Sequence, residues 1–414
     1  MTEMLDKVSH TVTLDSGKCK GCIACMKRCP TEAIRVRNGK ARVMNEKCIG
    51  CGECVRVCHH RAKRAVYDPL SVIGKFKYKI ALPPPSLFGQ FNNLDNMGIV
   101  LSALKRIGFD AVFEVARANE LVSDATRQIV KTEKPHIPII STACPAILQL
   151  IALKYHGVMG NLATLQDPVD IAARLAREEA IASGVPAEDI GVFYISPCPA
   201  KVSTLKAGLG LKTPVVDGVL AASDIYFKLL PEMKNCEDTD EVAKTGILGL
   251  SWASSGGEAV GSLMEKYVAA DGIENCMNVL RELEHNTLGH VEFIELNACT
   301  GGCVGGVLNI ENPFVARSKI RSLRKYLPIS KNNMEGFKKN VAYFKREVPI
   351  TQNMGLQLDG DFTTAIRKMH LINQVYSTLP GLDCGMCGAP SCRALSEDIA
   401  NGIADHSDCI NMGR

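Results

Sequence analysis

The stretch ELNACTGGCVGG, residues 295–306, sets two cysteines, Cys299 and Cys303, among four glycines. An apolar run over residues 291–296 leads into it and predicts a buried strand that ends where the cysteines begin. Glycine has no side chain, so the backbone after Cys299 can approach a bulky inorganic group closely. The stretch therefore predicts a strand end that holds such a group by its thiols.

Two other motifs have the same design. Residues 141–146, STACPA, contain Cys144, and residues 196–201, SPCPAK, contain Cys198; each motif follows an apolar run. In open α/β sheets, sites form beyond the carboxyl ends of the strands, so three strand ends can bring four thiols together. Taken singly, each cysteine could equally be a buried structural thiol. Jointly they predict a metal cluster held by Cys144, Cys198, Cys299 and Cys303.

Strand and helix patterns alternate around these motifs, over residues 77–347. Strands are expected at residues 76–82, 137–141, 189–196 and 291–296, and helices at residues 97–107, 116–132, 170–182 and 257–270. This alternation predicts an α/β domain of mostly parallel sheets with helices on both faces.

A cysteine repeat fills the first 70 residues. Residues 19–30, CKGCIACMKRCP, and residues 48–58, CIGCGECVRVC, share the spacing C-x2-C-x2-C-x3-C, with a hairpin expected between them at Asn38-Gly39. A cubane takes three thiolates from one run and the fourth from the other. The predicted sets are Cys19, Cys22, Cys25 and Cys58, and Cys48, Cys51, Cys54 and Cys29. Zinc is the alternative, but it rarely uses duplicated runs of this kind. The repeat therefore predicts a small α+β ferredoxin domain over residues 1–70.

A third cysteine set lies near the C-terminus, in LDCGMCGAPSC at residues 382–392 and at Cys409. Its four thiols, Cys384, Cys387, Cys392 and Cys409, predict another 4Fe-4S cluster in a small helical domain over residues 350–414, with helices at 362–379 and 393–403. Zinc or free thiols are the alternatives. The cluster would serve either as an electron exit or as a redox-sensitive contact for a partner.

Composition narrows the class of protein. Hydrophobic residues make up 46% and charged residues 22% of the 414 residues, as in an ordinary globular protein. Eighteen cysteines without a secretory signal favour metal binding over disulfides and predict a cytoplasmic protein of an anaerobe, with Cys236 and Cys276 as ordinary thiols. Scattered basic residues argue against nucleic acid, and residues 137–153 are too polar to cross a membrane.

The three central motifs resemble the signature loops of the iron-only (FeFe) hydrogenases, TSCCP, MPCxxK and ExMACxxGCxxGG. The resemblance implies that the four central cysteines hold a cubane and that Cys303 bridges it to a diiron unit with CO, cyanide and azadithiolate ligands. Lys201 would donate a hydrogen bond to a cyanide. It further implies cleavage of H2, electron transfer through four 4Fe-4S clusters to ferredoxin or another redox protein, and maturation proteins that insert the diiron unit.

Departures from the family pattern indicate slow turnover. The family's proton-relay cysteine is Ala143 here, and two methionines near the diiron unit are Ser196 and Asn297. Alanine cannot carry a proton, and the altered loops resemble a branch proposed to sense hydrogen. A sensory role would need a separate partner, such as a kinase or phosphatase, since the chain has no such motif.

The C-terminal cysteines resemble the small iron–sulfur domain of the Rnf-complex B subunit and of the corrinoid iron–sulfur protein. Two alternative functions stay open. One is a metabolic, ferredoxin-linked hydrogenase with a non-standard proton path. The other is a non-enzymatic electron-transfer or assembly factor without a diiron unit, similar to the nuclear prelamin A recognition factor-like proteins.

Overall fold

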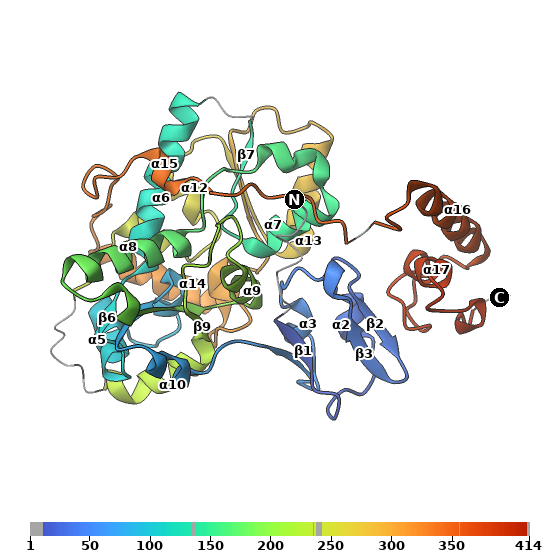
Figure 1. The fold of residues 1–414 in the computed structure, drawn as a ribbon, viewed down its shortest axis with the longest axis horizontal. Coiled ribbons are helices and arrows are strands. Elements are labelled where there is room, and N and C mark those ends of the chain that lie inside the picture. Colours follow the sequence, from blue (N-terminus) through green and yellow to red (C-terminus); the bar gives the residue numbers. More distant parts are fainter. Residues whose placement is uncertain (1–10, 134–136, 235, 237–241, 356, 412–414) are drawn as a thin grey trace. The chain divides into compact units, whose positions relative to one another are not determined.

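The structure, a computed structural model, describes residues 11–411 except 134–136, 235, 237–241 and 356. Figure 1 shows its helices and strands, coloured along the sequence. Contacts divide the chain into two units. The central unit comprises Val66–Thr351 together with Thr11, and the terminal unit combines Val12–Ala65 with Gln352–Arg414. The terminal unit is therefore built from two segments that the whole central unit separates in the sequence.

Two parallel sheets organise the described part of the central unit. The first has the strand order β6-β5-β8-β9, with β5 at Tyr78–Leu82, β6 at Ala111–Val112, β8 at Ile190–Ser196 and β9 at Gly218–Ala221. The second has the order β10-β11-β7, with β7 at Ile139–Ile140, β10 at Tyr267–Asp271 and β11 at Phe293–Asn297. All of these strand pairs are parallel, which confirms the predicted fold class.

Helices connect and cover the strands. They are α4 (Pro85–Phe88), α5 (Met97–Arg106), α6 (Val115–Thr132), α7 (Pro145–Lys154), α8 (Pro168–Ala182), α9 (Pro199–Ala207), α10 (Ala222–Met233), α11 (Ile247–Ser251), α12 (Gly257–Gly261), α13 (Ile273–Glu284), α14 (Pro313–Leu323) and α15 (Val341–Phe344). No helix of the described residues is long and apolar enough to cross a membrane.

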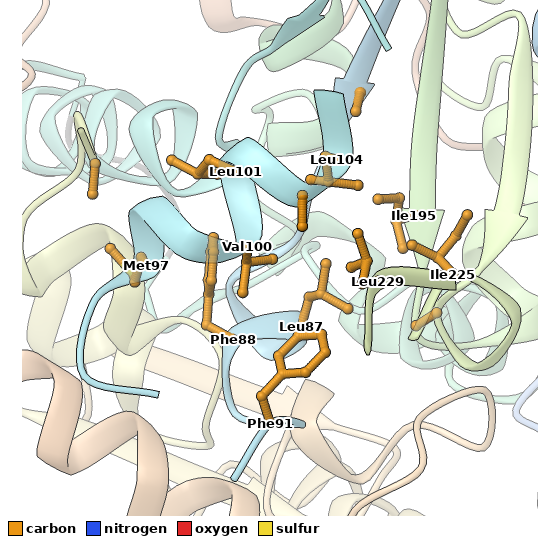
Figure 2. Packing of buried hydrophobic residues seen from close by; sticks show 14 of the residues in the cluster. Leu87, Phe88, Phe91, Met97, Val100, Leu101, Leu104, Ile195, Ile225 and Leu229 are labelled. Carbon is orange, nitrogen blue, oxygen red and sulfur yellow. The ribbon is translucent and has the colours of Figure 1, made fainter. Parts of the chain in front are cut away.

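Helix α5 shows how apolar packing holds the helices against the first sheet. Its apolar residues Met97, Val100, Leu101 and Leu104 recur at helical spacing and are buried. Figure 2 shows them in one cluster with Ile195 of β8 and with Ile225 and Leu229 of α10. Full burial of each such side chain stabilises the fold by roughly 1.5–3 kcal/mol. The cluster thus holds β8, the strand that leads to Cys198, in a fixed position.

One predicted helix is wrong. The sequence pattern predicts a helix over residues 257–270, but α12 ends at Gly261 and β10 begins at Tyr267. Leu263 has a positive φ of 52°, which interrupts the helix, and Tyr267 and Val268 are residue types that favour strands. Their backbone pairs with Phe293 and Ile294 of β11, so sheet pairing decides the local structure.

The terminal unit contains the predicted hairpin, β2 (Ile34–Arg37) and β3 (Lys40–Val43), and the pair β1 (Val12–Leu14) with β4 (Lys63–Ala65). Asn38 and Gly39 both have positive φ, as the tight turn requires. Short helices α2 (Ala24–Lys27) and α3 (Glu53–Arg56) carry two of the cysteines, and α16 (Phe362–Thr378) and α17 (Cys392–Ala400) form the second segment.

Charged side chains join the two segments of the terminal unit. The Nε of Arg35 lies 2.7 Å from Oδ2 of Asp398, and both side chains are more than nine-tenths buried. The backbone N–H of Val36 donates to the carbonyl of Gly388 at 2.9 Å. A Cβ at Gly388 would lie 1.9 Å from the Val36 oxygen, so only glycine permits this approach.

Candidate metal-cluster site

A cavity lies where β8 and β11 end in the central unit. It measures about 530 Å³, part of it open to solvent. Its lining includes the side chains Ala143, Asp167, Lys201, Glu258, Glu295, Asn297 and Cys303. The three cysteine motifs thus contribute to one cavity, as their strand-end positions predict.

Local structure places three thiols beside this cavity. Cys144 and Cys198 are the residues that cap the N-termini of α7 and α9, each followed by a proline in the first turn. Cys303 opens a 3-10 turn in the glycine-rich loop after β11. The backbone N–H groups at the start of α9 favour the thiolate form of Cys198.

The three thiols share one environment. Burial raises the pKa of Cys303, and the thiols of Cys198 and Cys144 raise it further. Burial likewise raises the pKa of Cys198 to about 11, although backbone N–H groups of Lys201 and Ala200 oppose this effect. Without metal, Cys198 and Cys303 are therefore neutral thiols near pH 7. A cluster that binds them as thiolates must displace their protons.

Cys299, the fourth predicted ligand, is half-buried two residues beyond β11. The glycines that follow Cys299 allow this loop to pack closely against neighbouring backbone. Gly302 has a φ of 92°, and a Cβ there would lie 2.5 Å from the backbone nitrogen of Ser255. A Cβ at Gly306 would lie 2.2 Å from the carbonyl oxygen of Pro197, so glycine brings this loop against the loop of Cys198.

Lys201 enters the cavity as a paired cation. Burial alone would lower its pKa, but the Asp167 carboxylate, which accepts a short hydrogen bond from Nζ, outweighs burial and the pKa is raised. Asp167 is held in turn, because its Oδ1 caps helix α8 by accepting from Val169 at 2.9 Å. Lys201 therefore keeps its proton and its orientation. Sequence reasoning missed Asp167, since an Asp-Pro helix start carries no sign of a distant lysine.

Two buried glutamates were also missed. Oε2 of Glu258 accepts from the Ser141 hydroxyl at 2.5 Å. The two oxygens of Glu295 accept from the backbone of Gly256 at 2.9 Å and of Ala259 at 3.0 Å. Burial, and then the charge of Glu295, raise the pKa of Glu258 to about 8. At neutral pH Glu258 therefore holds a proton at the cavity wall.

The remaining predicted residues take different positions. Ala143 lines the cavity, and its backbone N–H donates to the Ser141 hydroxyl at 3.2 Å. Asn297 also lines the cavity and donates from Nδ2 to Oε1 of Glu295 at 2.9 Å. Ser196 is fully buried, and its hydroxyl donates to the carbonyl of Cys198 at 2.8 Å. Ser196 therefore binds the backbone of the loop that carries Cys198.

In the terminal unit, the thiols gather in the groups expected from the repeat. Burial raises the pKa of Cys25, and the thiols of Cys22, Cys58 and Cys19 raise it further. For Cys51, burial raises the pKa most, followed by the thiols of Cys29, Cys54 and Cys48. Cys58 of the second run thus lies near Cys19, Cys22 and Cys25, and Cys29 of the first run lies near Cys48, Cys51 and Cys54.

Lys63 lies between these groups and was not predicted. Its side chain is 3% exposed, and its Nζ has no hydrogen-bond partner among the described residues. Its charge lowers the pKa of Cys25, Cys48 and Cys54 against the effect of burial. A buried cation in this position favours the charged form of the surrounding thiols.

The C-terminal thiols also come together. Burial raises the pKa of Cys387, and the nearby thiols of Cys384 and Cys409 add to this. Cys392 belongs to the same buried cluster as Cys387 and Cys409. The two cysteines outside the sets, Cys236 and Cys276, donate to backbone carbonyls. Among the described residues, no three His, Cys, Asp or Glu side chains converge as for a single metal ion.

The sequence matches three known families. Residues 77–259 and 208–307 match the iron only hydrogenase large subunit, C-terminal domain, and together they span more than half of the chain. Residues 11–59 match the 4Fe-4S dicluster domain, and residues 379–410 match an Fe-S cluster family.

Several curated proteins are similar in sequence. Iron hydrogenase 1 of Clostridium pasteurianum is 23% identical, with 74% of this chain and 66% of that protein covered. The NADP-reducing hydrogenase subunit HndD of Solidesulfovibrio fructosivorans is 20% identical with the same coverage. The chain thus spans slightly under two thirds of these relatives. The B subunit of the ion-translocating oxidoreductase complex of Methanosarcina acetivorans is 48% identical over 44 residues, 11% of this chain and 17% of that protein.

Solved structures agree on the fold. A variant of the FeFe-hydrogenase HydA1 from Chlamydomonas reinhardtii aligns with a TM-score of 0.52 at 13% identity, covering 67% of this chain and 95% of that chain. A second FeFe-hydrogenase structure, from work on oxygen inactivation, aligns with a TM-score of 0.51 at 12% identity and the same coverage. At this identity the likeness concerns the fold alone.

Proposed function

The chain belongs to the iron-only hydrogenase family, and we propose that it cleaves H2 reversibly, slowly and in a sensory role, at a diiron–cubane cluster. The resemblance seen in the sequence is confirmed for the family, for the dicluster domain and for the Rnf-B-like C-terminal segment. The chain is accordingly an iron–sulfur protein. Its place in the sensory branch and its turnover belong to the proposal.

The observation that carries the proposal is one cavity that contains the Cys303 thiol, the Lys201 ammonium and a protonated Glu258. The donor set fits the expected cofactor. Soft thiolates suit iron–sulfur clusters, and a buried cation suits anionic cyanide ligands. We assign Cys144, Cys198, Cys299 and Cys303 to the cubane, with Cys303 also as the bridge to the diiron unit, and Lys201 as a hydrogen-bond donor.

When bound, the diiron–cubane group would supply the binding of H2 and the redox chemistry. The side chains of the protein supply proton handling. Ala143 cannot carry a proton, whereas Glu258 holds one at the cavity wall and Ser141 fixes its carboxylate through the 2.5 Å hydrogen bond. Lys201 stays charged through Asp167. Glu258 would pass protons between the cavity and its surroundings, and the cysteines would hold the clusters that supply electron transfer.

An infrared spectrum of the anaerobic, matured protein tests this function. Sharp CO and cyanide bands that shift under H2, together with slow turnover, are expected. Ala143→Cys should raise turnover if the missing thiol limits the rate, and Ala143→Ser should not, because serine does not titrate near neutral pH. Absence of these bands in protein with fully loaded cubanes would identify an electron-transfer or assembly factor.

The metabolic alternative has support of its own in the buried pair Glu258 and Glu295, since a working proton route removes one reason for slow turnover. Turnover with reduced and oxidised ferredoxin separates the two roles. A rate like that of metabolic hydrogenases would overturn the sensory proposal. In a sensory role, the output would pass to a separate signalling protein.

A further inference from the structure

A second cleft lies in the central unit, between α14 and the segment that joins α11 to α12. It measures about 620 Å³, part of it open to solvent. One wall is formed by Arg317, Arg321 and Ile320 of α14, with Arg324 directly after that helix. The opposite wall is formed by serines and glycines of residues 251–257, with Val260 and Tyr267 at the side.

The charge in this cleft is uncompensated. Arg317, Arg321 and Arg324 recur at helical spacing, so their guanidinium groups project along one face. No carboxylate of the described residues forms an ion pair with any of the three, and no Asp or Glu lines the cleft. Like charges at this spacing repel each other. Such a group of arginines is stabilised by an anion from outside the chain.

The opposite wall offers further donors. The hydroxyl of Ser254 is buried and has no hydrogen-bond partner in the described part of the chain. Ser255 also lines the cleft. Its backbone N–H donates to the carbonyl of Gly301, so only its hydroxyl is offered to a ligand. Val260 and Tyr267 are 44% and 38% exposed, so an apolar and an aromatic surface stand beside the charged part.

We propose that this cleft binds a small phosphate ester, of which a nucleotide is the best-fitting class. Arginine presents a planar fork of donors that matches phosphate oxygens in pairs, and serine hydroxyls donate to the same group. The Tyr267 ring can stack on a planar base. The concave shape favours a small ligand over an acidic protein, which would need a broad and exposed surface.

Calorimetric titration of the full-length, anaerobic protein with ADP tests the proposal, with inorganic pyrophosphate as the second probe. One ADP is expected to bind per chain. Pyrophosphate should bind more weakly, because it lacks the base. Arg317→Ala and Arg324→Ala should each weaken ADP binding about 10-fold or more, since each removes charge-assisted hydrogen bonds to the phosphate.

Lys325→Ala is the matched control, because Lys325 is an exposed cation beside Arg324 that does not line the cleft. It should leave ADP affinity nearly unchanged, and Arg317→Lys should weaken binding less than Arg317→Ala. Equal weakening by Lys325→Ala would mean general surface attraction and would overturn the site. The proposal would also be overturned if neither ADP nor pyrophosphate bound. The same holds if the arginine variants weakened binding of an acidic ferredoxin and left ADP binding unchanged.

Discussion

The central cavity and the ferredoxin-like part of the terminal unit both gather cysteines, yet their surroundings differ. In the terminal unit the thiols come from short local runs, and the pocket beside Cys48 and Cys51 is almost wholly apolar. Glu53 lines this pocket, and its carboxylate accepts a hydrogen bond from Nε of Arg56 at 3.1 Å. In the central unit the thiols come from distant strand ends and share their cavity with Lys201, Glu258 and Asp167. Electron transfer requires only bound clusters, whereas H2 chemistry also requires groups that hold protons.

The strongest test of this difference is the loss of Cys303. In Cys303→Ala, H2 turnover should fall at least ~10³-fold, equivalent to about 4 kcal/mol, because the thiolate that we assign to both parts of the cofactor is gone. The CO and cyanide infrared bands should vanish as well. Cys54→Ala in the terminal unit is the counterpart and should slow electron exchange with ferredoxin while the bands persist. Loss of the bands in both variants would contradict a separation of the two roles.

A second test concerns the structural independence of the terminal unit. Asp398→Asn leaves Arg35 buried without its counter-charge, which should destabilise that unit by about 3 kcal/mol or more. Hydrogen exchange followed by mass spectrometry should show lost protection in β2 and α17. Glu397→Gln, which removes a partly exposed pair with Lys47, should cost less than about 1 kcal/mol. Equal loss of protection in β8 would show that the units unfold together.

The third test concerns proton handling. Glu258→Gln should lower turnover about 100-fold and leave the infrared bands in place, because it removes a proton carrier and no cofactor ligand. The pKa of Glu258 is raised to about 8, so it is protonated below that pH. H2 evolution should therefore fall as pH rises through about 8, and this inflection should be absent in Glu258→Gln. Glu258→Asp should retain part of the activity, and an unchanged pH profile in both would exclude Glu258.

The smallest expected effect belongs to Asp167. In Asp167→Asn, the largest charge that opposes burial at Lys201 is lost, leaving the smaller effects of Cys303 and Cys198, and the pKa of Lys201 should fall. Turnover is expected to drop about 10-fold, and the cyanide bands should shift because their hydrogen-bond donor is weakened. Asp189→Asn, which removes the partner of the exposed Lys77, is the control and should change neither. Unshifted bands in Asp167→Asn would show that Asp167 does not position Lys201.

Spacing along the chain predicted which cysteines lie near one another, because cluster binding imposes short, local patterns such as C-x2-C. Their role as cluster ligands stays a prediction. The strands before Cys198 and Cys299 were also predicted, since apolar runs mark buried strands. The partners of the site were not predictable in this way. Glu258 reaches Ser141, and Asp167 reaches Lys201, only through tertiary packing. The strand β10 was missed for a similar reason, since its pairing with β11 outweighs a local helical pattern.

The joining of Arg35 to Asp398 has a consequence for synthesis of the protein. The segment Val12–Ala65 leaves the ribosome before its partner Gln352–Arg414, with the central unit between them. At roughly 5–20 residues per second, tens of seconds pass while Val66–Thr351 is translated. During that interval Arg35 lacks its carboxylate, and the β2 edge lacks the carbonyl of Gly388. A nascent chain that stalls within the central unit therefore exposes an incomplete terminal unit, which closes only after Gln352–Arg414 has been translated.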